Sequence, residues 1–200
     1  MPLLSKSDLN RIVGQAYKST RIAKAMTDAT SLEQSTGTEK YDIFLSHSYL
    51  DKETVLQINY LLEDTFGFRV FVDWIEKPEL DRSKVTPGTA AEMRSVMDRC
   101  DTLLYTISTK SSSSTWMPWE LGYSDAKHGR IAVLPISDYK TTTSTYKGQE
   151  FVGLYPYILL NPKADDDSGD QFLWVHDPQD WNKYSLFNYW RVFGTLYDHA

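Results

Sequence analysis

The chain has 200 residues, of which 41% are hydrophobic and 14% aromatic, enough to build the core of one domain with extensions. Its net charge of −6 disfavours a general nucleic-acid binder, which usually gathers basic side chains on one face. The single cysteine, Cys100, excludes an intrachain disulfide framework and a cysteine-built zinc site. No apolar run approaches the roughly 20 residues that span a bilayer, and the N-terminus lacks a signal peptide's apolar region. We therefore expect a cytoplasmic protein.

Residues 1–36 differ in composition from the rest of the chain. Apolar residues recur there at helical spacing and indicate an amphipathic helix: Leu9, Ile12, Val13, Ala16 and Tyr17. The polar run SLEQSTGTEK that follows is typical of a linker. Basic and acidic residues are mixed along the helix, which favours docking on the domain over assembly or contact with a membrane surface.

The run YDIFLSHS, residues 41–48, is typical of a buried strand whose end opens into a loop. Ser48 and Asp51 fit the capping pattern of a helix with an apolar stripe, which Gly67 would end. FRVFVD, residues 68–73, predicts the next strand. A strand, a helix and a strand of these lengths form a right-handed unit with parallel pairing.

The segment from Trp74 to Gly88 predicts a long loop and a candidate lid, because long loops within compact domains tend to be functional. Thr89 and Glu92 then suggest a capping box. The helix they would start has one apolar face, made of Met93, Val96, Met97 and Cys100. Three further apolar runs predict strands at residues 102–108, 131–137 and 155–160.

The stretch SSSSTWMPWELGYSDAKHG, residues 111–129, predicts a helix that carries one carboxylate among aromatic side chains. Ser114 or Thr115 can cap its start, and Pro118 then falls in the first turn, where its missing N–H breaks no intrahelical bond. Gly129 supplies the stop.

Trp116 and Glu120 share a face of this helix, because residues four apart lie above one another. A carboxylate beside a flat indole can bind a sugar and a base. On the helix alone, the simpler interpretation is that Trp116 and Trp119 are core aromatics and that Glu120 is a solvated residue stabilised by the helix dipole. The elements around the helix must decide between the two.

Strands and helices alternate along the chain, and the strands are continuously apolar. This pattern predicts an α/β fold with a flavodoxin-like, five-stranded parallel sheet covered by helices on both faces. Ligands of such sheets bind beyond the carboxyl ends of the strands. Ser46, Ser48, Asp73 and the start of the Glu120 helix are all expected at that edge.

Four motifs together resemble the TIR domains of bacteria over roughly residues 40–160. They are S-x-W-x-x-x-E-L at Ser114 to Leu121, YDIFLSHS followed by Asp51, the lid ending in TPG, and the strand DTLLYTIS. We accordingly divide the chain into an N-terminal helical extension with its linker (1–36), a TIR domain (37–160) and an aromatic-rich C-terminal extension with a terminal helix packed on the domain (161–200). The acidic run ADDDSGD in that extension lacks EF-hand spacing, so no metal is expected there.

The resemblance implies an NAD nucleosidase or ADP-ribosyl cyclase, which releases nicotinamide and either ADP-ribose or a cyclic isomer of it. By the same resemblance, Glu120 takes the place of the catalytic glutamate. NAD is then a substrate, and no separate cofactor is expected. In antiphage systems of the Thoeris type the product signals to a separately encoded effector, which is one partner that the resemblance implies; self-association is another.

Further side chains are expected to contact this substrate: Ser46, Ser48, Asp73, Arg82, Lys84 and Trp116. The serines can contact ribose or phosphate, the two lid cations can bind the pyrophosphate, and the indole can stack on a ring. Each also has a plainer interpretation, as a turn former, a solvated charge or a core aromatic. An acid/base role for His47 is not expected, because neutral nicotinamide leaves without a general acid.

Two other classes of protein compete with the enzyme. A TIR adaptor would act by self-association without turnover, and the presence of Glu120 argues against it. A flavodoxin-like receiver or nucleotide carrier is also disfavoured, because a receiver needs an acidic cluster after the first strand, where this chain has Ser46, His47 and Ser48.

Overall fold

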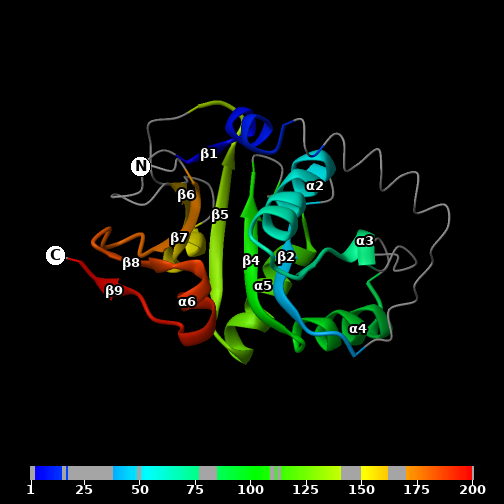
Figure 1. Cartoon of the computed structure of the whole chain (residues 1–200). Coiled ribbons are helices and arrows are strands. Elements are labelled where there is room, and N and C mark those ends of the chain that lie inside the picture. Colours follow the sequence, from blue (N-terminus) through cyan, green and yellow to red (C-terminus); the bar gives the residue numbers. More distant parts are fainter. Residues whose placement is uncertain are drawn as a thin grey trace.

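The computed structural model describes residues 3–14, 17, 38–48, 51–76, 85–108, 111, 114–140, 150–161 and 170–199. Within these ranges the strands form one sheet of nine, and helices lie on both of its faces (Figure 1). No helix in the described ranges is long and apolar enough to cross a bilayer.

The central strands are parallel and follow the order β3-β2-β4-β5-β6. They are β2 (Tyr41–Ser46), β3 (Val70–Phe71), β4 (Cys100–Ile107), β5 (Ile131–Ser137) and β6 (Tyr157–Asn161). This order confirms the flavodoxin-like parallel sheet that the sequence predicts. The strand expected over residues 68–73 is shorter than predicted, because Phe68 and Arg69 precede the pairing and Asp73 begins a helix.

Helices bury one hydrophobic cluster on each face of the sheet. The first face is covered by a helix over residues 6–14, by α2 (Lys52–Tyr60) with its π-helical continuation η2 (Leu61–Thr65), and by α6 (Phe187–Phe193). The second face is covered by α4 (Pro87–Met97), α5 (Trp116–Lys127) and the 3-10 turn η4 (Glu150–Leu154). Neighbouring strand residues such as Ile43 and Phe44 point into opposite clusters, as the pleat requires.

Glycines end two of the predicted helices at the expected residues. Gly67 has φ +73° and Gly129 has φ +64°, a left-handed conformation that costs glycine little. The start of α4 differs from the prediction, because the capping box is formed by Thr86 and Thr89 rather than by Thr89 and Glu92. At its other end α4 stops before Cys100, which is the first residue of β4 and not part of the helical face.

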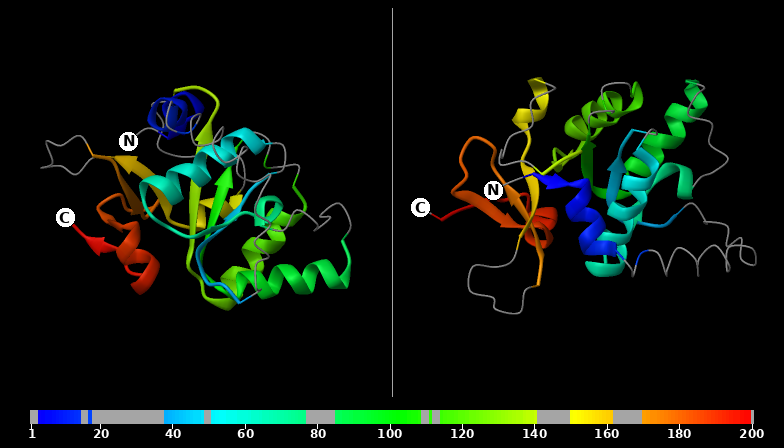
Figure 2. Two further views of the ribbon diagram at one scale, coloured as in Figure 1. Left: turned by 45° about the vertical axis from the view of Figure 1, so that its right-hand side comes forward. Right: turned by 90° about the horizontal axis from the view of Figure 1, so that it is seen from above.

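The N-terminal segment lies over the carboxyl end of β5. The short strand β1 (Leu4–Ser5) pairs in parallel with Ile136 and Ser137, and the helix that follows buries Leu9. Seen from above, this helix lies between β6 and α2 (Figure 2). It is held on α2 by a hydrogen bond of 2.6 Å from Gln57 Nε2 to Asn10 Oδ1.

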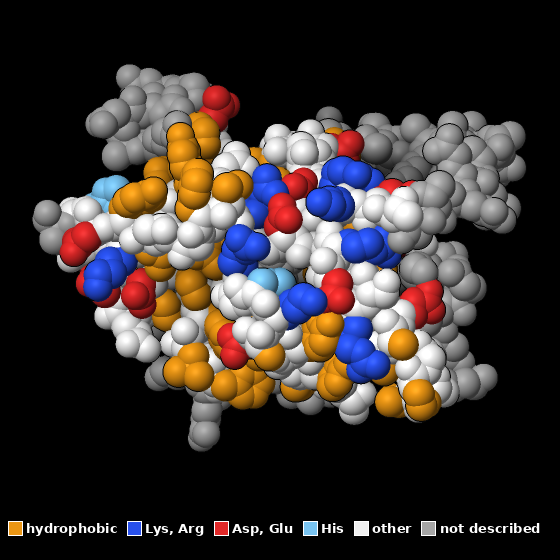
Figure 3. All heavy atoms as spheres, turned by 90° about the horizontal axis from the view of Figure 1, so that it is seen from below, with side chains coloured by type: hydrophobic (Ala, Val, Ile, Leu, Met, Phe, Trp, Pro, Cys, Tyr) orange, Lys and Arg blue, Asp and Glu red, His pale blue; other side chains and the backbone are white. Residues whose placement is uncertain are grey.

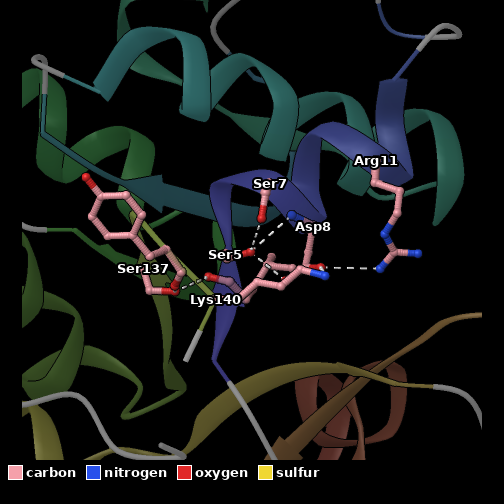
Figure 4. A network of polar contacts seen from close by, with 8 residues as sticks. Ser5, Ser7, Asp8, Arg11, Ser137 and Lys140 are labelled. Carbon is pink, nitrogen blue, oxygen red and sulfur yellow. Dashed lines mark hydrogen bonds and ion pairs between the residues drawn. The ribbon is translucent and has the colours of Figure 1, made fainter. Parts of the chain in front are cut away.

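A polar network fixes the start of this segment (Figure 4). The Ser5 hydroxyl donates to Asp8 Oδ2 at 2.5 Å, and Arg11 and Lys140 approach the other carboxylate oxygen at 3.4 and 3.6 Å. The Ser5 contact, supported by the two cations, lowers the pKa of Asp8 below its ordinary value.

The C-terminal extension widens the sheet with antiparallel strands. They are β7 (Phe172–His176), β8 (Lys183–Leu186) and β9 (Tyr197–Asp198), and β7 pairs with β6 along its whole length. The terminal helix is shorter than its apolar spacing predicts, because Gly194 with φ +68° ends α6 and Tyr197 belongs to β9.

Part of the apolar surface of this extension is exposed. The exposed side chains lie on α6 and β9: Tyr189, Val192, Phe193 and Tyr197. From below, hydrophobic side chains gather on the side of the C-terminal elements, whereas acidic and basic side chains mix over the middle of the face (Figure 3).

Candidate active site

Helix α5 carries Glu120 into the interior. The Ser114 hydroxyl accepts a hydrogen bond of 3.3 Å from the Met117 N–H, so it satisfies one of the unpaired donors of the first turn, and Pro118 needs no such partner. The buried face of the helix contains Met117, Glu120 and Leu121, and the side chain of Glu120 is 0% exposed. The interpretation of Glu120 as a solvated first-turn residue is therefore wrong.

The carboxylate of Glu120 meets the carboxyl end of β2, an inner strand of the sheet. Ser46, the last residue of β2, donates its hydroxyl to Glu120 Oε2 over 2.7 Å, and Ser46 is itself 0% exposed. Ser46 pairs with Tyr105 of β4, which fixes its backbone. The carboxylate is thus held at the edge of the sheet where parallel sheets bind ligands.

His47 follows directly and uses both of its ring nitrogens. The indole N–H of Trp74 points at His47 Nε2 over 2.8 Å, and Nδ1 lies 2.7 Å from the Leu45 carbonyl. Because an indole can only donate and a carbonyl can only accept, both contacts are satisfied when Nδ1 donates to the carbonyl and Nε2 accepts from the indole. Asp73 Oδ1 lies 3.4 Å from Nε2, a contact that becomes an ion pair only if that nitrogen is protonated.

These contacts give His47 a structural role. It ties Trp74, which lies just after β3 in α3 (Asp73–Glu76), to the end of β2. Lys52 Nζ lies 5.2 Å from the centre of the Trp74 ring and supports it from α2. The absence of an acid/base role for His47, expected from the sequence, is consistent with a ring that already serves two hydrogen bonds.

A second buried carboxylate lies at the same edge of the sheet. Asp51, just before α2, accepts a hydrogen bond from the Ser108 hydroxyl at the end of β4. Ser111 in turn accepts from the Ser108 N–H at 2.8 Å, and so fixes the start of the connection from β4 to α5. Asp51 was expected only as a helix cap, yet its side chain makes no capping bond and instead joins β4 to α2.

The remaining predicted site residues have different positions. Ser48 is buried beside the start of α2, where its carbonyl accepts from the Asp51 N–H at 3.0 Å. Trp116 is 8% exposed and packs edge-on against Trp119 within the second hydrophobic cluster. Arg82 and Lys84 lie outside the described residues.

Buried acidic side chains therefore lie at the carboxyl ends of three neighbouring strands, β3, β2 and β4. Glu120 and Asp51 each accept a serine hydroxyl from a neighbouring strand, and Asp73 lies beside His47. Among the described residues no group of three or more His, Cys, Asp or Glu side chains is arranged to hold a metal ion. Such a buried acidic edge suits a substrate in which positive charge is present or develops.

Comparison with known proteins matches the TIR domain to residues 43–172, a range that contains Ser46 at the end of β2 and the whole of α5. The chain belongs to the TIR-domain family. A curated relative is the probable 3' cyclic ADP-D-ribose synthase ThsB' of Bacillus cereus (strain MSX-D12). It is 38% identical over an alignment of 197 residues, which covers 95% of this chain and 98% of the relative. The matched range thus covers the parallel strands from β2 to β6 apart from the first two residues of β2, and the similarity to this relative extends over both extensions.

Sequence reasoning missed three residues of this TIR site: Asp51 as a partner of β4, Ser108, and Trp74. One signal pointed to Ser108, because it ends a predicted strand adjacent to β2 and the carboxyl ends of parallel strands meet at one edge. The contact between Trp74 and His47 had no comparable signal, since it depends on how the chain turns after β3.

Proposed function

We propose that this TIR domain cleaves the bond between nicotinamide and ribose in NAD, with Glu120 as the catalytic residue. The observation that carries the proposal is a fully buried glutamate, held by a hydrogen bond at the carboxyl edge of the sheet. It lies in a chain that is 38% identical to a probable 3' cyclic ADP-D-ribose synthase over nearly its whole length.

The chemistry needs one negative group. Nicotinamide is attached to ribose through a cationic nitrogen, so when the bond breaks its electron pair neutralises that nitrogen and nicotinamide leaves without being protonated. Positive charge then builds on the ribose, as in the oxocarbenium-like transition state of glycoside hydrolysis. A carboxylate held at this place stabilises that charge, and it does so best where water is excluded.

The attacking group decides the product. Water gives ADP-ribose, whereas a hydroxyl or an adenine nitrogen of the same molecule closes a ring. In each case the new bond forms at the ribose carbon, and one proton is lost from the attacking water, hydroxyl or adenine. The name of the relative gives its product as 3' cyclic ADP-D-ribose. We infer that this chain also forms a cyclic ADP-ribose isomer, through attack by a ribose hydroxyl.

Four of the predicted contacts keep the roles that the sequence suggests. Ser48 and Asp73 lie at the same edge as Glu120 and would contact the substrate, Ser48 at its ribose or phosphate, and Arg82 and Lys84 would bind the pyrophosphate. Because Glu120 is 0% exposed, NAD reaches its carboxylate only after neighbouring groups move. Self-association of the domain would supply such a movement, and a separately encoded effector would read the product, as in Thoeris-type defence.

The test is to incubate the purified chain with NAD and to identify the products by mass spectrometry. We expect free nicotinamide together with a nucleotide that is one water lighter than ADP-ribose. If ADP-ribose were the only nucleotide product, the proposed cleavage of NAD would stand and the proposed cyclisation would be wrong. Concentration-dependent oligomers with no turnover across the range in which they form would instead support the non-catalytic adaptor.

A further inference from the structure

A serine hydroxyl at the end of β2 contacts the carboxylate of Glu120. Ser46 was expected to contact the substrate, yet its hydroxyl donates to Glu120 Oε2 at 2.7 Å and its side chain is 0% exposed. An ionised carboxylate can only accept, so the hydroxyl proton is committed to Glu120. A direct bond from this hydroxyl to ribose or phosphate would require it to release the carboxylate.

We propose that Ser46 is a positioning residue, which fixes the carboxylate of Glu120 in the orientation that the reaction needs. This inference rests on the proposed function, in which Glu120 stabilises the charge on ribose. It gives Ser46 no contact with the substrate.

The two partners differ in how firmly their own backbone and side chain are fixed. Ser46 has a short side chain on an inner strand of the sheet, where its register is set opposite Tyr105 of β4. Glu120 has a long side chain on a helix, with three torsions to restrict. A hydroxyl whose position is fixed by the sheet can therefore hold the more flexible carboxylate of Glu120 in one orientation.

The contact also links the two elements that the reaction must hold together. Helix α5 packs against β4, β2 and β5, and no described main-chain hydrogen bond joins it to β2. The bond between Ser46 and Glu120 ties the catalytic carboxylate to the strand end itself. A shift of about 1 Å in a catalytic group can cost a factor of about 100 in rate.

The kinetic test uses Ser46→Ala. We expect kcat to fall roughly 10- to 100-fold while KM stays within about twofold. A carboxylate that is held less firmly stabilises the transition state less, whereas substrate binding is unchanged. Ser124→Ala is the matched control: Ser124 is buried one turn further along α5, and its hydroxyl faces Met97 Sδ at 3.7 Å. That variant should keep both constants.

A double-mutant cycle shows whether Ser46 acts through Glu120. In a Glu120→Ala background, which has no side-chain acceptor for the Ser46 hydroxyl, Ser46→Ala should lower the residual rate far less than it does in the wild type. The proposal is overturned if Ser46→Ala raises KM and leaves kcat unchanged, which would make Ser46 a substrate contact. It is also overturned if the substitution costs the same factor in both backgrounds.

A second cycle does not depend on turnover. The urea midpoints of Ser46→Ala, Glu120→Ala and the double variant should be non-additive, with the double variant losing less than the sum of the singles. If the wild type failed to cleave NAD, the proposed function would fall while this cycle still tested the hydrogen bond. Additive midpoints would show that Ser46 does not hold Glu120.

Discussion

His176 shows how one buried side chain links stability to acidity. It lies in β7, is 2% exposed, and stacks against Tyr184 with 5.1 Å between ring centres. Burial lowers the pKa of His176 below its ordinary value, an effect that a backbone hydrogen bond to Trp181 only partly offsets. The unfolded chain therefore binds a proton at this site at a higher pH than the folded chain does.

The sign of the pH dependence follows from that difference. Between the lowered folded pKa and the unfolded value of about 6.5, the unfolded state holds more protons, so the free energy of unfolding must rise with pH. We predict that the free energy of unfolding decreases from pH 7.5 to pH 5.5. The decrease should be smaller in His176→Phe, which keeps the ring stack but cannot titrate. Urea titrations at both pH values measure this.

A second histidine, His128, limits how much of the pH dependence His176→Phe can remove. Burial, followed by the charge of Arg130, lowers the pKa of His128 in the same direction, so part of the slope should remain in His176→Phe. An unchanged slope in the variant would show that His176 titrates alike in the folded and unfolded chains.

Cys100 gives a prediction about reactivity. Cys100 is the first residue of β4, and its buried thiol donates to the Val96 carbonyl. Burial raises the pKa of this thiol far above its ordinary range. Since the thiolate is the reactive form, iodoacetamide at pH 8 should label the native chain very slowly and the urea-unfolded chain quickly. Mass spectrometry of the two samples checks this, and fast native labelling would contradict the burial.

At this scale the sequence indicated Glu120 well and its partner poorly. A single carboxylate in a helix start with aromatic neighbours is visible in the sequence, and so is the serine that ends the first predicted strand. That Ser46 and Glu120 touch depends on how α5 crosses β2, which no local pattern encodes. Trp116 packs in the core for the same reason, because the rotation of α5 decides which side chain faces the sheet end.

At the level of elements, Arg191 fastens α6 to the amino ends of the parallel strands. Its guanidinium lies 2.7 Å from Asp42 Oδ1 and also pairs with Asp101 of β4. The side chain is only 19% exposed, and it lies over the Phe68 ring at 5.9 Å. Because a guanidinium shared between two carboxylates is shielded from solvent, this pair should matter more than a surface ion pair.

We predict that Arg191→Ala lowers the free energy of unfolding by roughly 1 to 2 kcal/mol. The matched control is Lys183→Ala in the same extension, whose pair with Asp180 spans 3.5 Å between exposed side chains and should contribute less than about 0.5 kcal/mol. Urea unfolding of the three proteins measures both values. Equal losses would mean that the contact of Arg191 is no better than a surface pair.

The strands of the two parts of the sheet differ in how visible they are in the sequence. β4 and β5 are largely apolar and buried, because helices cover both of their faces. β7 and β8 are short, half-buried and aromatic, and their sequence predicts only a packed C-terminal extension. Their place in the sheet depends on pairing with β6, a long-range contact that period and composition do not show.

At the scale of the whole molecule, both extensions share the sheet of the central domain. β1 pairs in parallel with β5, and β7 pairs antiparallel with β6, so the N-terminal and C-terminal segments both extend the sheet. The division of the chain near residues 37 and 160 stays a prediction. Contacts of this kind nevertheless suggest that the chain unfolds as one cooperative unit.

Leu9 tests this for the N-terminal segment. Its side chain is 0% exposed within the first hydrophobic cluster, which also contains Val55 and Ile58 of α2. We predict that Leu9→Ala lowers the free energy of unfolding by roughly 2 to 4 kcal/mol in a single transition. Leu154→Ala, at a side chain that is 69% exposed, should change little. A separate early transition in Leu9→Ala would show that the segment unfolds on its own.

The most direct test of the catalytic role of Glu120 is the rate of nicotinamide release from NAD by the wild type and by Glu120→Gln. The substitution keeps the shape of the side chain and an oxygen that can accept from Ser46, and it removes only the charge. At equal protein concentration and with equal urea midpoints, we predict a rate at least about 100-fold lower in the variant. Equal rates in the two proteins would contradict the catalytic role of this carboxylate.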